Sequence, residues 1–128
     1  MSDRNSPPVI VEVPAAPEQA YVLRSVVASV AARFDLPLDS IEDLKIAVDE
    51  AVAHLLTTGG TRLRMEVVPS DSGLKVTTST DASQAAWPPE GFEGSLTWQV
   101  LTGLTDEAWF AVDGGPILGF TKRALLHG

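Results

Sequence analysis

Three ionisable side chains lie on one edge of the second predicted helix, where they could carry acid–base chemistry. The spacing of Asp43, Glu50 and His54 places them along one line of an α-helix. Glu50 could act as a general base that accepts a proton from a hydroxyl, with His54 as its partner or as a metal ligand. The alternative is a solvated helix face, because one Glu and one His supply fewer ligands than the three of a catalytic zinc site.

Composition and charge narrow the classes of function. The chain has 128 residues with 17 acidic and 9 basic side chains, and its net charge of −8 disfavours direct nucleic-acid binding and favours a basic protein partner. Cysteine is absent, which excludes disulfides, thiolate catalysis and cysteine-held metal clusters. Because no apolar run reaches the roughly 20 residues that span a bilayer and the start of the chain has no signal-peptide core, we expect a cytoplasmic protein without a membrane segment.

The first half of the chain must supply the helices that position these residues. A β-branched run at 9–13 predicts a strand, and helical spacing predicts a first helix over 17–34. Ser40 followed by Asp43 resembles a capping box and predicts the start of the second helix, which ends before Gly59. The predicted core stripes of the two helices are Ala20, Leu23, Val27, Val30 and Phe34, followed by Ile41, Leu44, Val48, Ala51, Val52 and Leu55.

The second half is predicted to form most of the sheet. Alternating apolar and polar residues over 62–79 predict a hairpin that turns at Asp71-Ser72-Gly73. The remaining predicted elements are an irregular segment over 80–93, a third helix over 94–104 with Leu96, Val100, Leu101 and Leu104 facing the core, and two strands over 108–112 and 117–125.

The predicted order β-α-α-β-β-α-β-β, with most strands in hairpins, indicates an α+β fold. In this two-layer sandwich, helices cover one face of a mixed, mostly antiparallel sheet. It is expected to form one domain over residues 8–125, between a flexible N-terminus at 1–7 and a short tail at 126–128.

The three tryptophans fall in different predicted elements. Trp98 of the third helix and Trp109 of the fourth strand are expected to anchor the core, as aromatic side chains most often do. Trp87 belongs to the irregular segment, where it could as easily be a lid residue or an interface anchor as a residue that anchors packing.

The segment Ser40–Thr57, which reads SIEDLKIAVDEAVAHLLT, resembles the N-box helix of the histidine-kinase-like (GHKL, Bergerat-type) ATPases. Within that fold it is most similar to the bacterial anti-sigma factor kinases of the sigma-B and sigma-F type. Further matching pieces follow in the family's order along nearly the whole chain. They are the leading strand PPVIVEV, the arginine-bearing first helix, the helix GSLTWQVLTGLTDE at 94–107 and the closing Gly-Phe-Thr-Lys strand at 119–122.

The family's kinases use ATP and magnesium, and the resemblance implies where these cofactors would bind. Glu50 matches the glutamate that serves as catalytic base, and His54 stands at the position of the asparagine that holds magnesium. Asp81 could stand in for the adenine-binding aspartate. Of the second glycine box only Gly94 remains, with Leu96 at the other glycine position.

These departures from the family pattern predict that ATP binding and kinase activity are weakened or lost. A weakened site would still use ATP and magnesium, whereas a lost site would leave the protein without a cofactor. A neutral imidazole at His54 is a poor substitute for an oxygen ligand of magnesium. A cradle of backbone amides around phosphates needs glycine where the chain approaches the ligand closely or takes a positive φ. An active ATP-dependent serine kinase of an anti-anti-sigma factor is the alternative.

The resemblance also implies protein partners. In this family an arginine on the first helix contacts both the sigma factor and the competing anti-anti-sigma protein, and Arg24 occupies that position, beside Tyr21 in a wide apolar surface. The other interpretation of Arg24 is an exposed solubilising charge. We therefore predict a homodimeric anti-sigma factor that sequesters an alternative sigma factor and is released by an anti-anti-sigma (STAS-type) partner in a stress response. A non-catalytic interaction module of the same fold, with no transcriptional role, is a further alternative.

Overall fold

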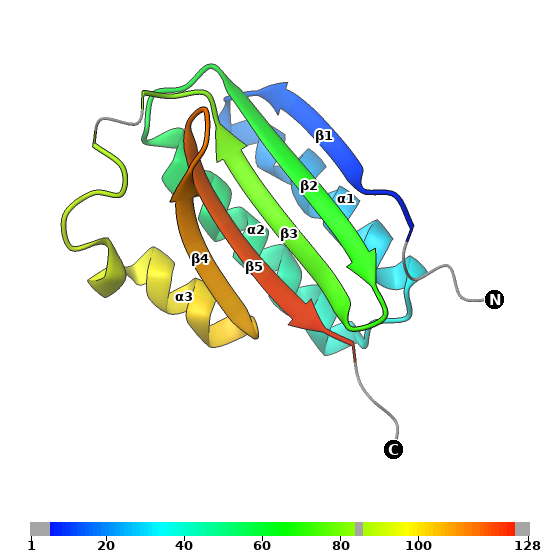
Figure 1. Cartoon of the computed structure of the whole chain (residues 1–128). Coiled ribbons are helices and arrows are strands. Elements are labelled where there is room, and N and C mark those ends of the chain that lie inside the picture. Colours follow the sequence, from blue (N-terminus) through cyan, green and yellow to red (C-terminus); the bar gives the residue numbers. More distant parts are fainter. Residues whose placement is uncertain (1–5, 84–85, 125–128) are drawn as a thin grey trace.

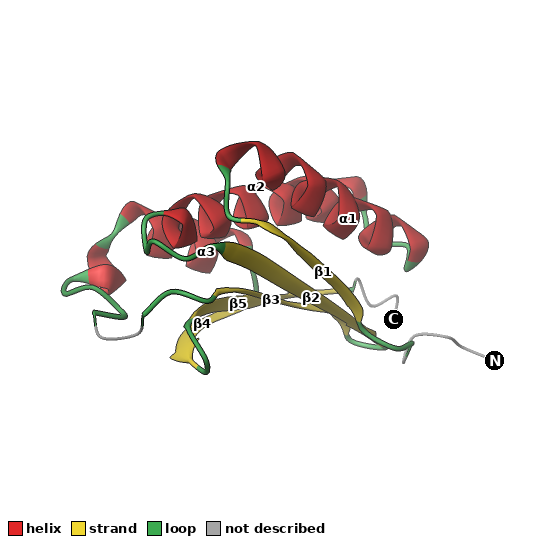
Figure 2. Cartoon of the chain, turned by 90° about the horizontal axis from the view of Figure 1, so that it is seen from above, coloured by secondary structure: helices red, strands yellow, loops and turns green. Residues whose placement is uncertain are grey.

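All strands in the part of the chain that the structure describes, residues 6–83 and 86–124, join one sheet in the order β1-β2-β3-β5-β4. In this computed structural model, three α-helices of the described chain cover one face of that sheet, and the other face carries no helix (Figures 1 and 2). The predicted two-layer α+β sandwich is confirmed, with strand pairs that are all antiparallel in the described residues rather than mixed.

Along the chain the order is β-α-α-β-β-α-β-β once two short 3-10 turns are set aside. The strands are β1 (Val9–Pro14), β2 (Arg62–Ser70), β3 (Gly73–Thr80), β4 (Glu107–Val112) and β5 (Pro116–Arg123). The α-helices are α1 (Ala20–Arg33), α2 (Leu38–Leu56) and α3 (Leu96–Leu104), and the 3-10 turns are η1 (Pro17–Gln19) and η2 (Phe92–Gly94).

The register of the sheet directs its apolar side chains toward the helices. β2 and β3 form the predicted hairpin, in which Leu63 is opposite Thr80 and Ser70 is opposite Gly73. Because side chains alternate along a strand, the polar residues between the buried ones face the helix-free side. β5 is inserted between β3 and β4, which brings Phe120 into the centre of the sheet.

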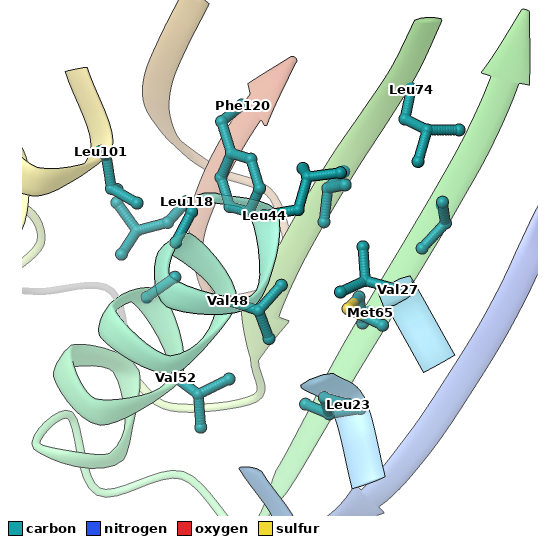
Figure 3. Packing of buried hydrophobic residues seen from close by; sticks show 14 of the residues in the cluster. Leu23, Val27, Leu44, Val48, Val52, Met65, Leu74, Leu101, Leu118 and Phe120 are labelled. Atoms are coloured by element: carbon teal, nitrogen blue, oxygen red, sulfur yellow. The ribbon is translucent and has the colours of Figure 1, made fainter. Parts of the chain in front are cut away.

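The core lies between α2 and the sheet (Figure 3). Val48 of α2, Met65 of β2 and Phe120 of β5 have no exposed surface there. Full burial of such a side chain contributes about 1.5–3 kcal/mol. The predicted stripes of the first two helices are confirmed apart from their first residues, Ala20 and Ile41, which are half-buried. The buried residues of α1 and α2 are Leu23, Val27, Val30 and Ala31, followed by Leu44, Ala47, Val48, Ala51, Val52 and Leu55.

The start of α2 differs from the prediction. The helix begins at Leu38 after Pro37, with no side-chain capping bond, so the capping box predicted at Ser40 is wrong. Pro37 has φ −61° and ψ 154°, a conformation that its ring favours, and its carbonyl accepts a hydrogen bond from Ile41 N at 3.0 Å. Ser40 therefore lies inside the first turn.

The inward face of α3 also differs from the prediction. Ser95 caps this helix, because its Oγ accepts a hydrogen bond from Trp98 N at 3.1 Å. Leu96 is 69% exposed, whereas Thr97 and Leu101 are buried. The predicted inward position of Leu96 is therefore wrong. The polar Thr97 faces the core in its place.

The two predicted tryptophan anchors lie on different faces of the sheet. Trp98 is half-buried against the core, as predicted. Trp109 is opposite Gly119 of β5, whose neighbours in the strand face the helices, so the indole lies on the helix-free face and the core prediction for it is wrong. It covers Gly119, and Lys75 Nζ lies 5.6 Å from the ring centroid.

Several predicted boundaries lie at or beyond the limits of the described chain. The last two strands differ by a residue or two from the predicted ranges. The flexible N-terminus predicted at 1–7 lies mostly outside the described residues, and the tail predicted at 126–128 lies entirely outside them. Within the ranges that are described, no helix is long and apolar enough to cross a membrane.

Candidate functional site

The predicted acid and imidazole of α2 share one hydroxyl from α3. Thr97 Oγ1 donates to Glu50 Oε1 at 3.0 Å and lies 3.5 Å from His54 Nδ1. Glu50 and His54 are one turn apart on α2, and Thr97 lies in the first turn of α3, which packs beside α2 (Figure 1). The structure thus brings together two of the predicted site residues through a third that the sequence did not single out.

His54 is enclosed by aromatic rings. Its ring centroid lies 4.9 Å from that of Phe92 and 5.6 Å from that of Trp87, both in tilted geometry. Burial lowers the pKa of His54 below its ordinary value, and the nearby Glu50 carboxylate opposes this effect. The imidazole is therefore neutral at neutral pH.

These rings come from residues 86–95 of the long connection between β3 and α3, a segment called the strap below. Trp87 Nε1 donates to the carbonyl of Ala111 on β4 at 2.9 Å. Gly91 has φ +79°, a left-handed conformation that favours glycine. The residue that follows it, Phe92, is only 3% exposed. The strap therefore turns at Gly91 and places an aromatic ring against the end of α2.

Phe92 joins the strap to α3 and to the sheet. Its ring centroid lies 5.5 Å from that of Trp87, 5.7 Å from that of Trp98 and 5.5 Å from that of Phe110, with the last pair perpendicular. Aromatic pairs of this kind contribute about 0.5–1.5 kcal/mol each beyond their buried area. Rings thus occupy the space between α2, α3 and β4.

The space that remains beside His54 is small. It is a cavity of about 260 Å³. Its lining includes Thr57 and Thr58, which directly follow α2, and Trp87 and Pro89 of the strap. Small-molecule sites usually measure roughly 300–1,000 Å³. The cavity is therefore smaller than a usual small-molecule site.

A larger hollow of about 400 Å³ lies on the helix-free face of the sheet, away from these residues. Its rim carries Arg62 and Arg64, whose Nε atoms lie 3.8 and 3.6 Å from the carboxylate of Glu12. Exposed ion pairs of this length contribute little. Neither the acid nor the imidazole of α2 takes part in this hollow.

Asp81 binds backbone groups near the start of β2. Its carboxylate accepts hydrogen bonds from the hydroxyl of Thr61, from Thr61 N at 2.7 Å and from Arg62 N at 3.1 Å. Together these bonds lower the pKa of Asp81 to about 2, and the bond from the Thr61 hydroxyl contributes most. The carboxylate thus holds in place the end of the connection between α2 and β2. Its role as the adenine-binding residue stays a prediction.

Gly94 occupies an exposed position at the end of η2. No atom lies within 4 Å of the place where a side chain would begin, and its φ is not left-handed. The local backbone therefore does not require glycine at this residue, unlike at Gly91. The cofactor-binding role of Gly94 stays a prediction.

Asp43, the first residue of the predicted acidic line, contacts the sheet instead. Lys122 Nζ of β5 lies 3.0 Å from Asp43 Oδ2 and donates to the carbonyl of Leu104 at 2.7 Å. The lysine side chain is 17% exposed. A cation at the last carbonyls of a helix is favourable, so this contact ties α2, α3 and β5 together.

Arg24 lies on the side of α1 that faces α2. Its Nη1 donates to both carboxylate oxygens of Asp49, at 3.0 and 2.9 Å, and its guanidinium lies 5.6 Å from the ring centroid of Tyr21. The side chains of Arg24 and Asp49 remain 33% and 41% exposed. Arg24 is therefore an ion-paired residue that solvent, or another molecule, can still reach.

The surface beside this ion pair is apolar. A hollow of about 460 Å³ lies between β1 and α1, and its lining includes Val9, Tyr21, Val22, Val26 and Arg33. Tyr21 is 65% exposed. Tyr21 and Val22 thus form an exposed apolar surface beside Arg24, and its role toward a partner stays a prediction.

The residues around Glu50 do not fit magnesium and ATP in the conformation that the structure describes. Within residues 6–83 and 86–124, no three His, Asp or Glu side chains gather as a metal-binding group. The Glu50 carboxylate already accepts the hydroxyl of Thr97, and Trp87 and Phe92 contact His54. Magnesium prefers an octahedron of oxygen ligands, whereas this arrangement offers one carboxylate and one imidazole.

Two residues that the sequence did not single out complete the site. Thr97 could have been found from Ser95, because a helix capped there places residue 97 on the same face as Leu101. Phe92 lies in the irregular segment and gave no periodic signal. Its place against His54 depends on how the strap folds.

Comparison with known proteins identifies relatives of the chain, although no protein-family model matches it. The anti-sigma-F factor RsbW of Mycobacterium tuberculosis is 31% identical, and the match covers 84% of this chain and 67% of that protein. The serine-protein kinase RsbW of Halalkalibacterium halodurans is 33% identical, and the match covers 86% of this chain and 79% of that protein.

The fold also has a solved counterpart. The crystal structure of the RsbU and RsbW domains of Rv1364c from Mycobacterium tuberculosis matches with a TM-score of 0.71 and 16% identity. The match covers 93% of this chain and 33% of that chain, so this chain spans about a third of its length. This likeness shows the fold, and the two relatives that are more than 30% identical show the family. The chain belongs to the RsbW family of anti-sigma factors and serine-protein kinases.

Proposed function

We propose that this chain is an anti-sigma factor that binds and sequesters an alternative sigma factor, and that an anti-anti-sigma partner of the STAS type releases it. The observation that carries the proposal is the outward face of α1. This helix has Arg24 and Arg33 as its charged residues, and its Tyr21 and Val22 are 65% and 36% exposed. A helix that faces only solvent normally carries polar residues on that side, and an exposed apolar surface marks an interaction site.

Charge supports a basic partner. The chain carries a net charge of −8, which would attract a protein rich in Lys and Arg and speed its association. Arg24 adds a specific group, because its half-exposed ion pair with Asp49 can be exchanged for an acidic group of a partner. The relative from Mycobacterium tuberculosis is named an anti-sigma-F factor, which supports a sigma factor as the partner. The compartment we propose is the cytoplasm, and the assembly a homodimer.

We also propose that ATP binding and phosphate transfer are weakened or lost in this chain. The hydrogen bond from Thr97 to Glu50 and the rings around His54 support this, since both groups are already engaged. The alternative is an active serine kinase of an anti-anti-sigma factor. It is favoured by the retained Glu50 and by 33% identity to a relative named as a serine-protein kinase.

Affinity capture followed by calorimetry tests the partner. The tagged protein is used to capture proteins from its native cytoplasm with and without magnesium-ATP, and a captured sigma factor is then purified and titrated. We expect a sigma factor under both conditions. Arg24→Ala should weaken its binding at least about tenfold. The matched control Arg64→Ala, on the helix-free face, should leave binding unchanged. Equal binding by the two variants, or no co-elution with any sigma factor, would contradict the proposal.

A phosphate-transfer assay distinguishes the kinase alternative from the loss of activity that we propose. The protein is incubated with millimolar magnesium-ATP and a purified anti-anti-sigma protein, and phosphoserine is measured by mass spectrometry. We expect no transfer above that of Glu50→Gln. Transfer that this substitution abolishes would establish the kinase instead. Light scattering on the eluted protein measures whether it is a dimer.

A further inference from the structure

We propose that the strap, residues 86–95, is an intramolecular plug: its Trp87 and Phe92 rings occupy the place of a nucleoside triphosphate beside Glu50 and His54. The inference rests on the proposed function, because it takes this surface of α2 as a nucleotide site. It differs from simple loss of the site, since a plug leaves the space in the fold and closes it with the chain's own side chains.

The plug is a surface segment with two inserted rings. Its backbone is at the surface, and Pro88, Glu90 and Glu93 are all exposed. Phe92, in contrast, is 3% exposed and contacts His54 at a ring distance of 4.9 Å. Phe92 belongs to the buried cluster and contacts the ring of Phe110 on β4, so opening of the segment would withdraw one buried ring from the space between α2, α3 and β4.

The strap is held by hydrogen bonds within itself and by bonds to α3 and β4. Its turns are held by hydrogen bonds within the strap, from Phe92 N to the carbonyl of Pro89 and from Gly94 N to that of Gly91. At the end of the strap, Ser95 Oγ accepts a hydrogen bond from Trp98 N at 3.1 Å, which fixes this end to α3. Its tie to β4 is the hydrogen bond from Trp87 Nε1 to Ala111, together with ring contacts.

Two glycines flank the inserted ring. Gly91 has a left-handed φ, and neither Gly91 nor Gly94 has an atom within 4 Å of the place where a side chain would begin. The backbone on both sides of Phe92 therefore has room to change conformation, as hinge positions require. The local backbone does not require glycine at residue 94, and a hinge of the strap at this position explains its presence.

Thr97 completes the closure from the side of α3. Its hydroxyl donates to Glu50 Oε1 at 3.0 Å, in a position where a bound ligand's own hydroxyl or water would meet the carboxylate. Thr97 belongs to α3, beyond the hinge at Gly94, so its hydrogen bond to Glu50 is a second closure that is separate from the two rings.

Hydrogen exchange on the unaltered protein tests whether the strap opens. We expect the amides of the strap and the Trp87 indole N–H to exchange at least about 100-fold faster than the amides of β5, through local opening. The indole of Trp109 on the opposite face serves as an internal reference. Exchange of the strap only together with β5, in global unfolding, would overturn the proposal.

Nucleotide binding tests whether the strap occupies the site. Magnesium-ATP is titrated calorimetrically into the wild type, into Trp87→Ala and into Trp87→Ala combined with Thr97→Val. We expect each removal to increase affinity, and the double variant to bind at least about tenfold more tightly than the wild type. The matched control Trp109→Ala removes the same ring from the other face and should bind as the wild type does.

The outcomes separate this proposal from the proposed function. Circular dichroism and a cooperative unfolding transition establish that each variant is folded. If the folded double variant binds no better than the wild type, the plug is refuted while sigma-factor binding by the same variants still supports the anti-sigma function. If the wild type binds no sigma factor, the proposed function fails regardless of what the strap does.

Discussion

The hydroxyl of Thr97 lies 3.0 Å from Glu50 Oε1 and 3.5 Å from His54 Nδ1, so two ionisable groups of α2 share one side chain of α3. A hydroxyl has a single proton to donate, and the carboxylate at the shorter distance receives it. The hydrogen-bond donor that holds Glu50 therefore comes from the first turn of α3.

Thr97→Val is expected to destabilise the protein by about 1–2 kcal/mol. The substitution keeps the shape of the side chain, removes the hydroxyl and leaves the part-buried Glu50 carboxylate without this donor. Urea unfolding followed by circular dichroism measures the change. The control is Thr102→Val, whose hydroxyl bonds to the carbonyl of Trp98 on the exposed side of the same helix. Equal losses for the two variants would contradict a special role for the contact with Glu50.

The ion pair between Asp43 and Lys122 is expected to couple α2 to β5. Asp43→Ala and Lys122→Met should each destabilise the protein, and the double variant should lose about 0.5–1.5 kcal/mol less than the sum, because the Lys122 side chain is only 17% exposed and that of Asp43 33%. The more exposed pair of Glu42 and Lys45 should show a coupling below about 0.5 kcal/mol. Urea unfolding of the two cycles checks this, and similar couplings would refute it.

Hydrophobic periodicity predicted α1 and α2, because each of these helices packs on the sheet along its whole inner face. The stripes from Leu23 to Val30 and from Leu44 to Leu55 are continuous and apolar, so a single packing arrangement satisfies them. The inner face of α3 was missed because the polar Thr97 stands at a buried position. Trp109 was misplaced because residue type does not specify which face of a strand is covered.

The candidate site could be predicted as far as it lies on one helix. Glu50 and His54 come together because they are four residues apart on α2. Their partners Thr97 and Phe92 come from segments more than 35 residues away in the sequence. How a non-periodic segment folds back depends on tertiary packing, here on the turn at Gly91 and the aromatic cluster. Sequence spacing carries no signal for such contacts.

Asp81 is expected to make stability depend on pH in the acid range. Its hydrogen bonds lower the pKa of the folded state to about 2 from an unfolded value near 3.8, so the unfolded chain binds the proton more readily. The stabilisation is present above about pH 4 and is lost as pH falls toward 2. The difference in free energy of unfolding between the wild type and Asp81→Asn, measured by urea at several pH values, should shrink over that window. A difference that is constant down to pH 2 would contradict the assignment.

Gly119→Ala is expected to destabilise the protein by about 1–2 kcal/mol through overpacking on the helix-free face. A methyl group at this residue would overlap the indole of Trp109, and the ring would have to leave its place beside Lys75. In a Trp109→Ala background the same substitution should cost nothing or stabilise slightly, because alanine loses less conformational entropy than glycine in a strand. Thermal unfolding of the four proteins measures this coupling, and tryptophan emission reports the displaced indole. An unchanged cost of Gly119→Ala without the indole would mean that the strand itself, and not Trp109, requires glycine.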